Sequence, residues 1–366
     1  MMPKILHVSH SLETGGGPLY IRKIIEDVPG VEHYVAGNTG YYYDLFREKL
    51  GARRVARLAG KNLIKNLRII LALCKQEGIQ VIHCHGRGAA LYSRLVKLVK
   101  PDIRIIYTVH GFHPETVRTG VRAMYILMER MMFRYTDYVI HVSLSERSRF
   151  LRHVKPSDPS RCLYIPNYIT ASDIPTREVP VMLEPTVVNL VYVGRLGHEK
   201  GIDILVNAMI LLRKKGVKLW VIGYGPMEAA LVSMVRTADV SEHVIFLGKY
   251  DGASAFLRHF DAIVIPSRFE GMPFIGLEAM ISKAPIICTP AVGITDLVTA
   301  DTAYMSRDFE PASLEVAINA FLKDRAESPE SIQHKVDANY RTVQSDFSPA
   351  NAEKLGDLYR ELNSIG

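Results

Sequence analysis

Short apolar runs alternate with longer amphipathic stretches along almost the whole chain, and this alternation limits the folds open to it. The runs that suit strands buried on both faces are residues 4–9, 81–83, 104–109, 138–142, 187–193, 219–222, 244–247, 262–265 and 285–288. Strands that alternate with helices form parallel sheets with right-handed crossovers, and their ligands bind beyond the carboxyl ends of the strands. The sequence therefore predicts the α/β class, with functional loops directly after strands.

The charge of the chain divides it into two halves. Residues 1–165 hold 26 lysines and arginines against 13 aspartates and glutamates, whereas the remaining residues hold 19 against 25. A segment rich in proline, serine, aspartate and threonine lies between these halves. The alternation alone would also allow one continuous sheet or barrel. The change in charge favours two Rossmann-like domains of residues 1–165 and 187–345, joined by a linker of residues 166–186.

The overall composition is that of an ordinary globular protein, with 48% hydrophobic residues, 23% charged residues and a net charge of +7. It excludes a disordered or collagen-like chain, and no apolar run approaches the ~20 residues of a membrane-spanning helix. The first residues lack the pattern of a signal peptide. The four cysteines lie far apart, so we expect them to be reduced and buried in a cytoplasmic protein.

Two loops that follow predicted strands suit an anion. Gly15 and Gly16 stand between the first strand and the first helix, where glycine lets backbone amides approach a phosphate. A plain tight turn is the alternative there. Arg195 and Lys200 follow the strand at residues 187–193, and two cations beside a helix start suit a diphosphate. A solvated charged loop is the alternative for this pair.

The segment 267–280 is the most specific pattern in the chain. It follows the apolar run 262–265 and carries Glu270 in a loop and Glu278 eight residues later, in a predicted helix. Gly271 and Met272 precede Pro273, so their amides are expected to point out of the helix N-terminus. One carboxylate can then meet a sugar and the other a ribose diol.

The spaced set of these motifs resembles the retaining glycosyltransferases of family 4, which have the GT-B architecture of two Rossmann-like domains facing across a cleft. The resemblance rests on Glu-Gly-Met-Pro…Glu-Ala-Met in residues 270–280, Gly-Arg-Leu…Lys-Gly in 194–201, Ile-Gly-Tyr-Gly-Pro in 222–226 and Thr-Gly-Gly-Gly in 14–17. It spans nearly the whole chain. It also implies that the final segment, residues 346–366, contains a helix that packs back on the first domain.

The resemblance implies roles for individual residues. His110 and Glu270 would act at the reacting centre. A nucleotide-sugar donor, with UDP or GDP as its nucleotide, would be bound by Gly15, Gly16, Arg195, Lys200, Gly225, Lys249, Gly271, Met272, Pro273, Phe274 and Glu278. The acceptor side would include His85, Arg87 and His113.

The sequence favours a reaction without a metal ion or other cofactor. His83 and His85 share one face of a strand, as a metal site requires, but no convincing set of carboxylate ligands follows on later strands. These two histidines more simply shape the acceptor side or satisfy hydrogen bonds in the core. No Asp-x-Asp occurs in the chain, so we predict that Arg195, Lys200 and helix N-termini stabilise the leaving group.

Basic residues recur on the helical patterns of the first half, among them Arg94, Lys97, Lys100, Arg122 and Arg130. Solvated helix faces are the simplest interpretation. The alternative interpretation is a functional one, in which these residues are attracted to anionic lipid headgroups by ~1 kcal/mol per basic residue. A nucleic-acid partner is disfavoured because no aromatic platforms are interleaved with these residues. We therefore expect a peripheral protein at the inner face of the cytoplasmic membrane that acts on a lipid-linked saccharide.

The stretches at residues 83–87 and 107–112 look most like those of transferases that build bacterial surface polysaccharides, such as O-antigen, capsule or exopolysaccharide. The predicted reaction is hexosyl transfer with retention, in which the donor phosphate leaves as the acceptor hydroxyl attacks the anomeric carbon on the same side. A nucleotide-sugar epimerase or hydrolase on the same scaffold is one alternative, and a non-catalytic nucleotide-sugar binder is another.

Overall fold

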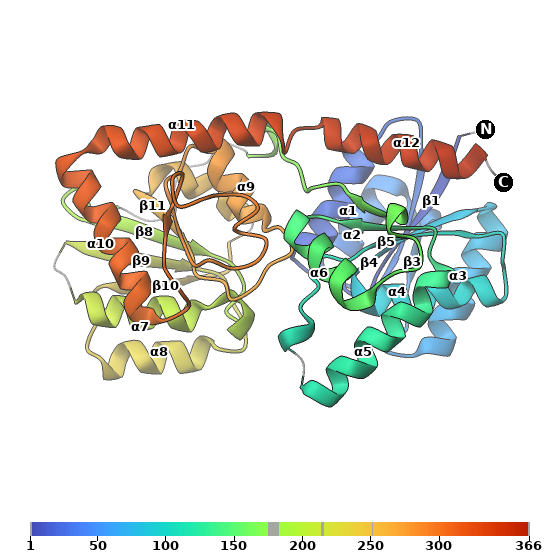
Figure 1. Ribbon diagram of the computed structural model, residues 1–366, viewed down its shortest axis with the longest axis horizontal. Coiled ribbons are helices and arrows are strands. Elements are labelled where there is room, and N and C mark those ends of the chain that lie inside the picture. Colours follow the sequence, from blue (N-terminus) through green and yellow to red (C-terminus); the bar gives the residue numbers. More distant parts are fainter. Residues whose placement is uncertain (1, 117, 175–182, 214–215, 251, 365–366) are drawn as a thin grey trace. The chain divides into compact units, whose positions relative to one another are not determined.

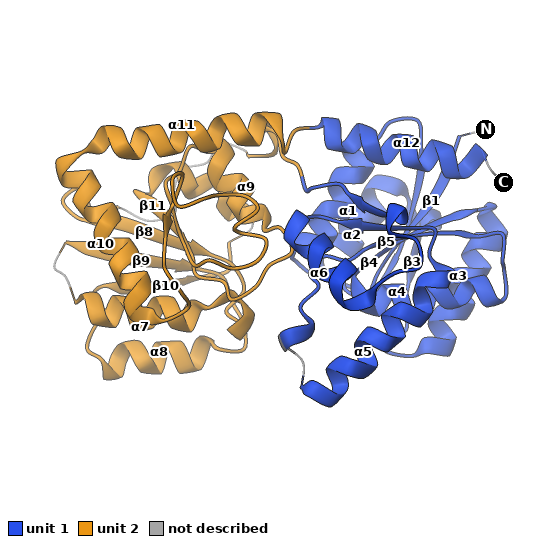
Figure 2. Cartoon of the chain, in the orientation of Figure 1, with its two compact units in different colours: residues 1–167, 349–366 blue, residues 168–348 orange. Residues whose placement is uncertain are grey.

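The computed structural model describes residues 2–116, 118–174, 183–213, 216–250 and 252–364 (Figure 1). The chain folds into two compact units, residues 1–167 with 349–366 and residues 168–348 (Figure 2). The division falls within the predicted linker, of which residues 175–182 lie outside the described residues. No helix in the described part of the chain combines the length and apolarity that crossing a membrane requires.

The first unit is built on a seven-stranded parallel sheet with the strand order β3-β2-β1-β4-β5-β6-β7. Its strands are β1 (Lys4–Ser9), β2 (Glu32–Gly37), β3 (Val55–Arg57), β4 (Val81–His85), β5 (Arg104–Thr108), β6 (Tyr138–His141) and β7 (Cys162–Tyr164). Its helices are α1 (Gly16–Asp27), α2 (Tyr41–Leu50), α3 (Leu63–Glu77), α4 (Gly86–Leu95), α5 (Thr119–Met132), α6 (Leu144–Val154) and α12 (Ala350–Ser364).

The second unit repeats this plan with a six-stranded parallel sheet in the order β10-β9-β8-β11-β12-β13. Its strands are β8 (Val188–Val193), β9 (Val217–Ile222), β10 (Val244–Gly248), β11 (Ala262–Ile265), β12 (Ile286–Cys288) and β13 (Tyr304–Met305). Its helices are α7 (Ile202–Leu212), α8 (Glu228–Thr237), α9 (Phe274–Ile281), α10 (Pro311–Glu327) and α11 (Pro329–Ser345). The first six strands of each unit therefore follow the Rossmann order 3-2-1-4-5-6. The prediction of an α/β protein with two Rossmann-like domains is confirmed.

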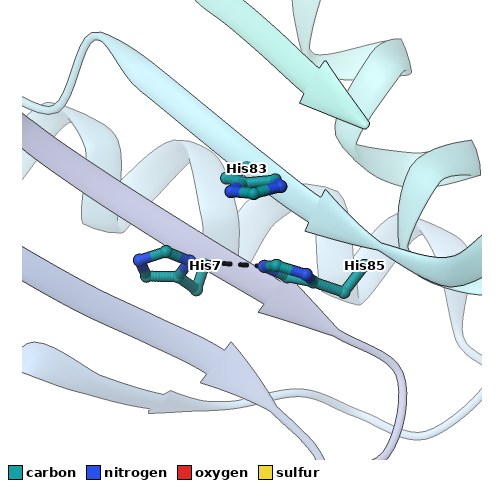
Figure 3. A group of neighbouring side chains, drawn as sticks. All are labelled: His7, His83 and His85. Atoms are coloured by element: carbon teal, nitrogen blue, oxygen red, sulfur yellow. Dashed lines mark hydrogen bonds between the residues drawn. The ribbon is translucent and has the colours of Figure 1, made fainter. Parts of the chain in front are cut away.

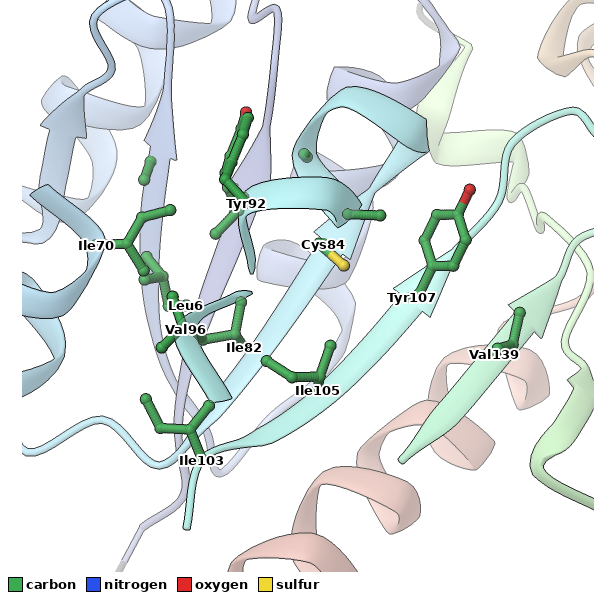
Figure 4. Packing of buried hydrophobic residues seen from close by; sticks show 14 of the residues in the cluster. Leu6, Ile70, Ile82, Cys84, Tyr92, Val96, Ile103, Ile105, Tyr107 and Val139 are labelled. Carbon is green, nitrogen blue, oxygen red and sulfur yellow. The ribbon is translucent and has the colours of Figure 1, made fainter. Parts of the chain in front are cut away.

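The core of the first unit follows from the alternation of side chains along its strands. Leu6 of β1, Ile82 and Cys84 of β4, and Ile105 and Tyr107 of β5 all point to one face of the sheet and are fully buried (Figure 4). Successive side chains of a strand point to opposite faces, so the residues between them line the other face. All four cysteines are unpaired and buried, as the sequence predicts.

The other face of this sheet holds histidines where apolar side chains are usual. His7 of β1 is opposite His83 of β4 in the strand register, and His85 ends β4 two residues later. All three are buried (Figure 3). The C-terminal helix α12 contributes to this face, because the hydroxyl of Tyr359 lies 2.6 Å from Nδ1 of His83. A buried histidine needs such partners, because an unpaired polar group in the core costs free energy.

Candidate functional site

In the second unit, the loops after β8, β9 and β11 pack backbone against backbone. A Cβ on Gly201, where φ is +61°, would lie 1.9 Å from the backbone oxygen of Pro266. A Cβ on Gly223 would lie 1.8 Å from the backbone oxygen of Gly194, and one on Gly225 would lie 2.4 Å from that of Leu196. Glycine is therefore required at these positions by contacts within the protein, and the predicted role of Gly225 in donor binding stays a prediction.

The same loops bring Lys200 and Glu270 together from positions 70 residues apart. Nζ of Lys200 lies 2.6 and 2.8 Å from the two carboxylate oxygens of Glu270, which is only 9% exposed. The hydroxyl of Ser267 donates a further hydrogen bond of 2.7 Å to Glu270. Lys200 keeps 31% of its side chain exposed. A carboxylate held from one side by a hydroxyl thus positions a partly exposed cation at the carboxyl ends of the strands.

A second ion pair, which sequence reasoning missed, fastens this arrangement. Both terminal nitrogens of Arg268 bind the carboxylate of Asp203 at 2.7 Å, in the bidentate geometry that suits arginine. Arg268 also donates to the carbonyl of His198, and its backbone amide donates to the carbonyl of Glu199. Arg268 therefore ties the loop after β11 to the loop and helix after β8. The available signal was a charged residue in the loop after β11 and another in the first turn of the helix that follows the adjacent strand β8.

Arg195 is held far more loosely than Lys200. Its side chain is 67% exposed, and its guanidinium lies 3.8 Å from the Glu199 carboxylate. A guanidinium with so much solvent exposure is able to turn towards an anion, at little cost in lost contacts. The structure therefore places one exposed cation, Arg195, and one positioned cation, Lys200, in the same loop.

The segment before α9 is buried in the second unit. Pro273 is the N-cap residue of α9, which begins at Phe274. Gly271, Met272, Pro273 and Phe274 are all buried. The first amides of a helix carry a partial positive charge that favours an anion, and the predicted contacts of these four residues with the donor stay a prediction.

Glu278 of α9 is a carboxyl group that titrates near neutral pH. Burial raises its pKa from 4.5 to about 7, although the Ser254 hydroxyl donates a hydrogen bond that favours the carboxylate. The negative charge of Asp173 adds to the rise. A carboxyl group whose pKa is perturbed by its surroundings is a common mark of a binding site.

The loops after β9 and β10, which carry the predicted donor-binding residues Gly225 and Lys249, meet in the same unit. The amide of Gly223, after β9, donates to the carbonyl of Gly248 at the end of β10. Nζ of Lys249 then lies 5.8 Å from the centre of the Tyr224 ring, which is 46% exposed. An exposed ring beside a cation provides a surface on which a planar base can stack.

In the first unit, His110 lies in the loop after β5 in a strained conformation. Its φ is +55°, which is uncommon for any residue other than glycine. The next residue, Gly111, donates its amide hydrogen to the carboxylate of Glu146, which is fully buried. His110 is half-buried, and its Nε2 lies 3.2 Å from Nδ1 of His85. Strained residues cluster at functional sites, in keeping with the predicted importance of His110.

The histidine face contains a group of atoms with the spacing of metal ligands. One ring nitrogen from each of His7, His83 and His85 lies within 4.8 Å of the others, so the three could hold a metal ion. However, His83 is bonded at 2.6 Å to the hydroxyls of both Tyr359 and Thr108. His7 and His85 are bonded to other imidazoles. A metal would have to displace these bonds, and metal-independent action stays a prediction.

The other predicted residues of the first unit lie near its surface. Gly15 and Gly16 are exposed at the start of α1, and a Cβ on Gly15 would meet nothing within 4 Å. Arg87 is exposed, with its guanidinium 4.6 Å above the ring of Tyr125. Nδ1 of His113 lies 3.4 Å from a guanidinium nitrogen of Arg149. His85, in contrast, is buried, so its predicted contact with an acceptor is not supported by exposure.

Two cations, a buried carboxylate and a helix N-terminus thus lie beyond the carboxyl ends of a Rossmann sheet, the place where such sheets bind ligands. Family models identify the class of the protein. Residues 30–172 match the model of Glycosyltransferase Family 4, and residues 188–324 match that of Glycosyl transferases group 1. The first match ends within the predicted linker and the second begins after it, and together they cover most of the chain. The chain therefore contains a Glycosyltransferase Family 4 domain followed by a Glycosyl transferases group 1 domain.

Several curated proteins are similar to this chain. The O-antigen biosynthesis glycosyltransferase WbnH of Escherichia coli is 24% identical over 226 residues, 62% of this chain and 63% of the relative. A glycogen synthase of Mycobacterium tuberculosis is 26% identical over 73% of this chain and 65% of its own length. The chain thus aligns with less than two thirds of these relatives. The putative teichuronic acid biosynthesis glycosyltransferase TuaC of Bacillus subtilis is 31% identical over 47% of this chain and 42% of its own length.

Solved structures share the fold over its whole length. Anabaena Alr3699/HepE, in complex with UDP and glucose, has a TM-score of 0.82 at 15% identity, covering 99% of this chain and 100% of that one. Sucrose-phosphate synthase from Thermosynechococcus elongatus has a TM-score of 0.81 at 19% identity, with complete coverage of both chains. These likenesses confirm the predicted GT-B fold.

Proposed function

We propose that this protein is a retaining, metal-independent glycosyltransferase that moves a hexose from a nucleotide-sugar donor to a saccharide acceptor in the biosynthesis of a surface polysaccharide. The observation that carries the proposal is the pairing of Lys200 with the buried Glu270, beside the N-terminus of α9. The names of two relatives, an O-antigen and a teichuronic acid glycosyltransferase, support the product class. The complexes of Anabaena HepE with UDP and UDP-glucose support a nucleotide-sugar donor.

In this proposal the second unit binds the donor. Lys200 and Arg195 neutralise the diphosphate, and the amides before α9 complete its surroundings. Glu270, whose two oxygens already hold Lys200, accepts hydrogen bonds from sugar hydroxyls. Glu278, in its carboxylate form, accepts hydrogen bonds from the two ribose hydroxyls. Because Glu270 holds Lys200 before the ligand arrives, Lys200 can stabilise the charge that develops on the leaving phosphate with little reorganisation, whereas Arg195 has to turn towards the anion.

The proposed transfer is a substitution on one face of the sugar. The bond between the anomeric carbon and the phosphate oxygen breaks, and the bond between that carbon and the acceptor oxygen forms on the same side. The proton of the acceptor hydroxyl moves to the departing phosphate. In the first unit we assign His110 to a substrate hydroxyl, since its half-buried ring is firmly oriented by His85.

The test is an assay with UDP-, GDP- and ADP-sugars and a mixture of lipid-linked saccharide acceptors, followed by NMR of the product linkage. We expect acceptor-dependent release of one nucleotide, an unchanged anomeric configuration and full activity in a chelator. Inversion of configuration would contradict the proposed mechanism, and loss of activity in chelator with recovery in magnesium would contradict metal independence. Release of free sugar without acceptor would indicate a hydrolase. Conversion of the donor sugar into its epimer would indicate an epimerase, and binding without turnover would indicate a non-catalytic binder.

We also propose that the first unit binds the inner face of the cytoplasmic membrane, where a lipid-linked acceptor would lie. Helix α5 (Figure 1) exposes an apolar stripe at helical spacing. Its members, Val121, Met124, Leu127 and Met131, are between 47 and 65% exposed. The arginines on or beside the same helix are Arg118, Arg122, Arg130 and Arg134. Apolar side chains with flanking cations are the pattern of a helix that lies at an anionic bilayer surface.

Vesicle flotation tests this second part. We expect the protein to float with phosphatidylglycerol vesicles and not with phosphatidylcholine vesicles, and to be released by salt. Met124→Asp should weaken binding strongly, because it places a charge within the apolar stripe. Val316→Asp is the matched control, since Val316 is 65% exposed on α10 of the second unit. Equal binding of both variants would show that α5 is not the contact surface.

A further inference from the structure

Four histidines from neighbouring strands form one continuous series of hydrogen bonds. His33 of β2, His7 of β1 and His85 of β4 come from adjacent strands, and His110 follows β5, the next strand of the sheet. The nitrogen–nitrogen distances are 3.0 Å from His33 to His7, 3.3 Å from His7 to His85 and 3.2 Å from His85 to His110. The link between His7 and His85 is drawn in Figure 3.

Every link in this series has the same direction. Nδ1 of His33 faces Nε2 of His7, Nδ1 of His7 faces Nε2 of His85, and Nδ1 of His85 faces Nε2 of His110. A neutral imidazole carries one N–H and one lone pair. The series therefore has only two fully bonded arrangements, with every proton on Nε2 or every proton on Nδ1.

The rings are neutral over the ordinary pH range. Burial lowers the pKa of His33 and of His110 to about 4, and it lowers the pKa of His7 and of His85 well below the usual value. An imidazolium would have two N–H groups and would interrupt the series, because neither nitrogen could then accept.

The far end of the series distinguishes the two arrangements. Nε2 of His33 lies 3.4 Å from the carbonyl oxygen of Val28, at the end of α1. A carbonyl oxygen only accepts, so Nε2 of His33 must donate, and its Nδ1 must accept from His7. It follows that Nε2 of His7 donates to His33, Nε2 of His85 donates to His7, and Nε2 of His110 donates to His85.

We propose that the Val28 carbonyl and the series His33–His7–His85 fix His110 as the Nε2–H tautomer, so that its Nδ1 accepts a hydrogen bond from a hydroxyl group of the substrate. That the hydroxyl belongs to a sugar rests on the proposed function. His33, His7 and His85 are positioning residues in this scheme, because they act through His110.

Two neighbours could oppose this assignment, and neither does so in the structure. The Glu146 carboxylate would favour a proton on Nδ1 of His110 if it accepted from that atom. Its two oxygens instead accept from the amides of Gly111 and Val142. The ring of His83 lies against that of His85, tilted by 34° with ring centres 4.2 Å apart, but its hydrogen bonds go to the hydroxyls of Thr108 and Tyr359.

The test is ¹⁵N NMR of the full chain labelled at histidine, without donor or acceptor. Long-range correlations between ring hydrogens and nitrogens distinguish the two tautomers, and the signals of His110 are identified by their loss in His110→Gln. We expect His110 as a single Nε2–H tautomer at neutral pH. An Nδ1–H pattern would overturn the proposal, and so would stoichiometric metal bound to His7 and His85.

The role of the series is tested by removing its anchor. His33→Leu leaves no acceptor for His7, so we expect His110 to become a mixture of tautomers. His33→Asn places an amide oxygen near the former Nδ1 and should restore the single tautomer. An unchanged His110 in His33→Leu would show that the tautomer is set locally. This readout needs no turnover, so it can succeed where the transfer assay fails, and the two proposals fail separately.

Discussion

The two units share a strand order, but the polar groups near their strand ends differ in charge, position and burial. In the second unit these groups are charged, lie in loops and form ion pairs that stay partly exposed, such as Lys200 with Glu270. In the first unit they are neutral histidines that lie largely within the strands and are buried, such as His7 and His83. Charge in loops suits the binding of an anion, whereas neutral groups in a rigid sheet fix the direction of a hydrogen bond.

The largest expected difference between the two units is in their stability at acidic pH. The buried histidines His7, His33, His83 and His85 have folded-state pKa values below that of an unfolded histidine. Their contribution to stability is therefore complete above pH 6.5 and decreases as the pH falls below that value, down to a pH of about 4 in the case of His33. Each such group changes the free energy of unfolding by ~1.4 kcal/mol per pH unit. Hydrogen exchange should show the β1 and β4 amides losing protection between pH 7 and 5.

The second unit contains a group with the opposite trend. The folded-state pKa of Glu278 is raised to about 7, so its contribution to stability falls as the pH rises from 4.5 to 7. Amides of the second unit should therefore lose less protection in acid than those of β1 and β4. Variant His33→Gln should reduce the acid sensitivity of β1, and His334→Gln, at an exposed position of α11, should not. Equal protection of β1 at pH 5 and 7 would contradict the assignment of neutral, buried histidines.

Breaking one ion pair in each unit should have the next largest effect. Arg94 and Glu129 in the first unit are bonded at 2.9 Å, and each is 2% exposed. Glu129→Gln leaves a buried guanidinium without a counter-charge and should lower the free energy of unfolding by ~3–5 kcal/mol. Asp203→Asn in the second unit breaks a pair that is about one fifth exposed, and should cost ~1 kcal/mol. Urea denaturation measures both, and similar losses would contradict the difference in burial.

Removing the positioned cation should reduce turnover while leaving the first unit intact. Lys200→Met deletes the charge proposed to stabilise the leaving phosphate, and should lower kcat by ~10²–10³. Lys218→Met is the control, because Lys218 forms an ion pair with Glu184 away from the loops described above. The tautomer of His110 should be unchanged in both variants. Unchanged turnover in Lys200→Met would remove the main support for the proposed donor site.

The smallest effect concerns the pH dependence of donor affinity. A carboxylate accepts two ribose hydroxyls, whereas the protonated form has lost one acceptor. With a pKa of about 7 for Glu278, the ionised fraction rises about tenfold between pH 6 and 8, and nucleotide affinity should rise with it. Glu278→Gln should bind more weakly and show no such rise. Calorimetric titration with the nucleotide at both pH values gives the result, and a parallel rise in the variant would assign the titration to another group.

The sequence predicted the second unit better than the first. Among the described strands, the sequence missed β2, β3 and β7 of the first unit but only β13 of the second, and the structure pairs Lys200 and Glu270 from two of the predicted motifs. This succeeded because functional loops follow strands that are fully apolar and easy to find. Arg268 and Asp203 were missed because a charged residue in a loop has many possible partners, and only the fold selects one.

The histidine series could not be predicted from the sequence in the same way. His7 and His33 lie in different strands, and their contact depends on the register of β1 with β2 and β4. Strand β2 itself was missed, since its six residues include Glu32, His33 and Gly37. The alternation of side chains placed His83 and His85 on one face, but the identity of their neighbours required the sheet order.

The hydrogen bond between Tyr359 and His83 joins residues 276 positions apart, and it has a consequence for biosynthesis. The first unit begins to leave the ribosome before the second, yet its closing helix, α12, is translated after the whole of the second unit. Until α12 has been translated, Tyr359 cannot bond His83 on the histidine-bearing face of the sheet. Nascent chains arrested before residue 349 should therefore present a finished second unit beside an unfinished first one, so translation order and folding order differ.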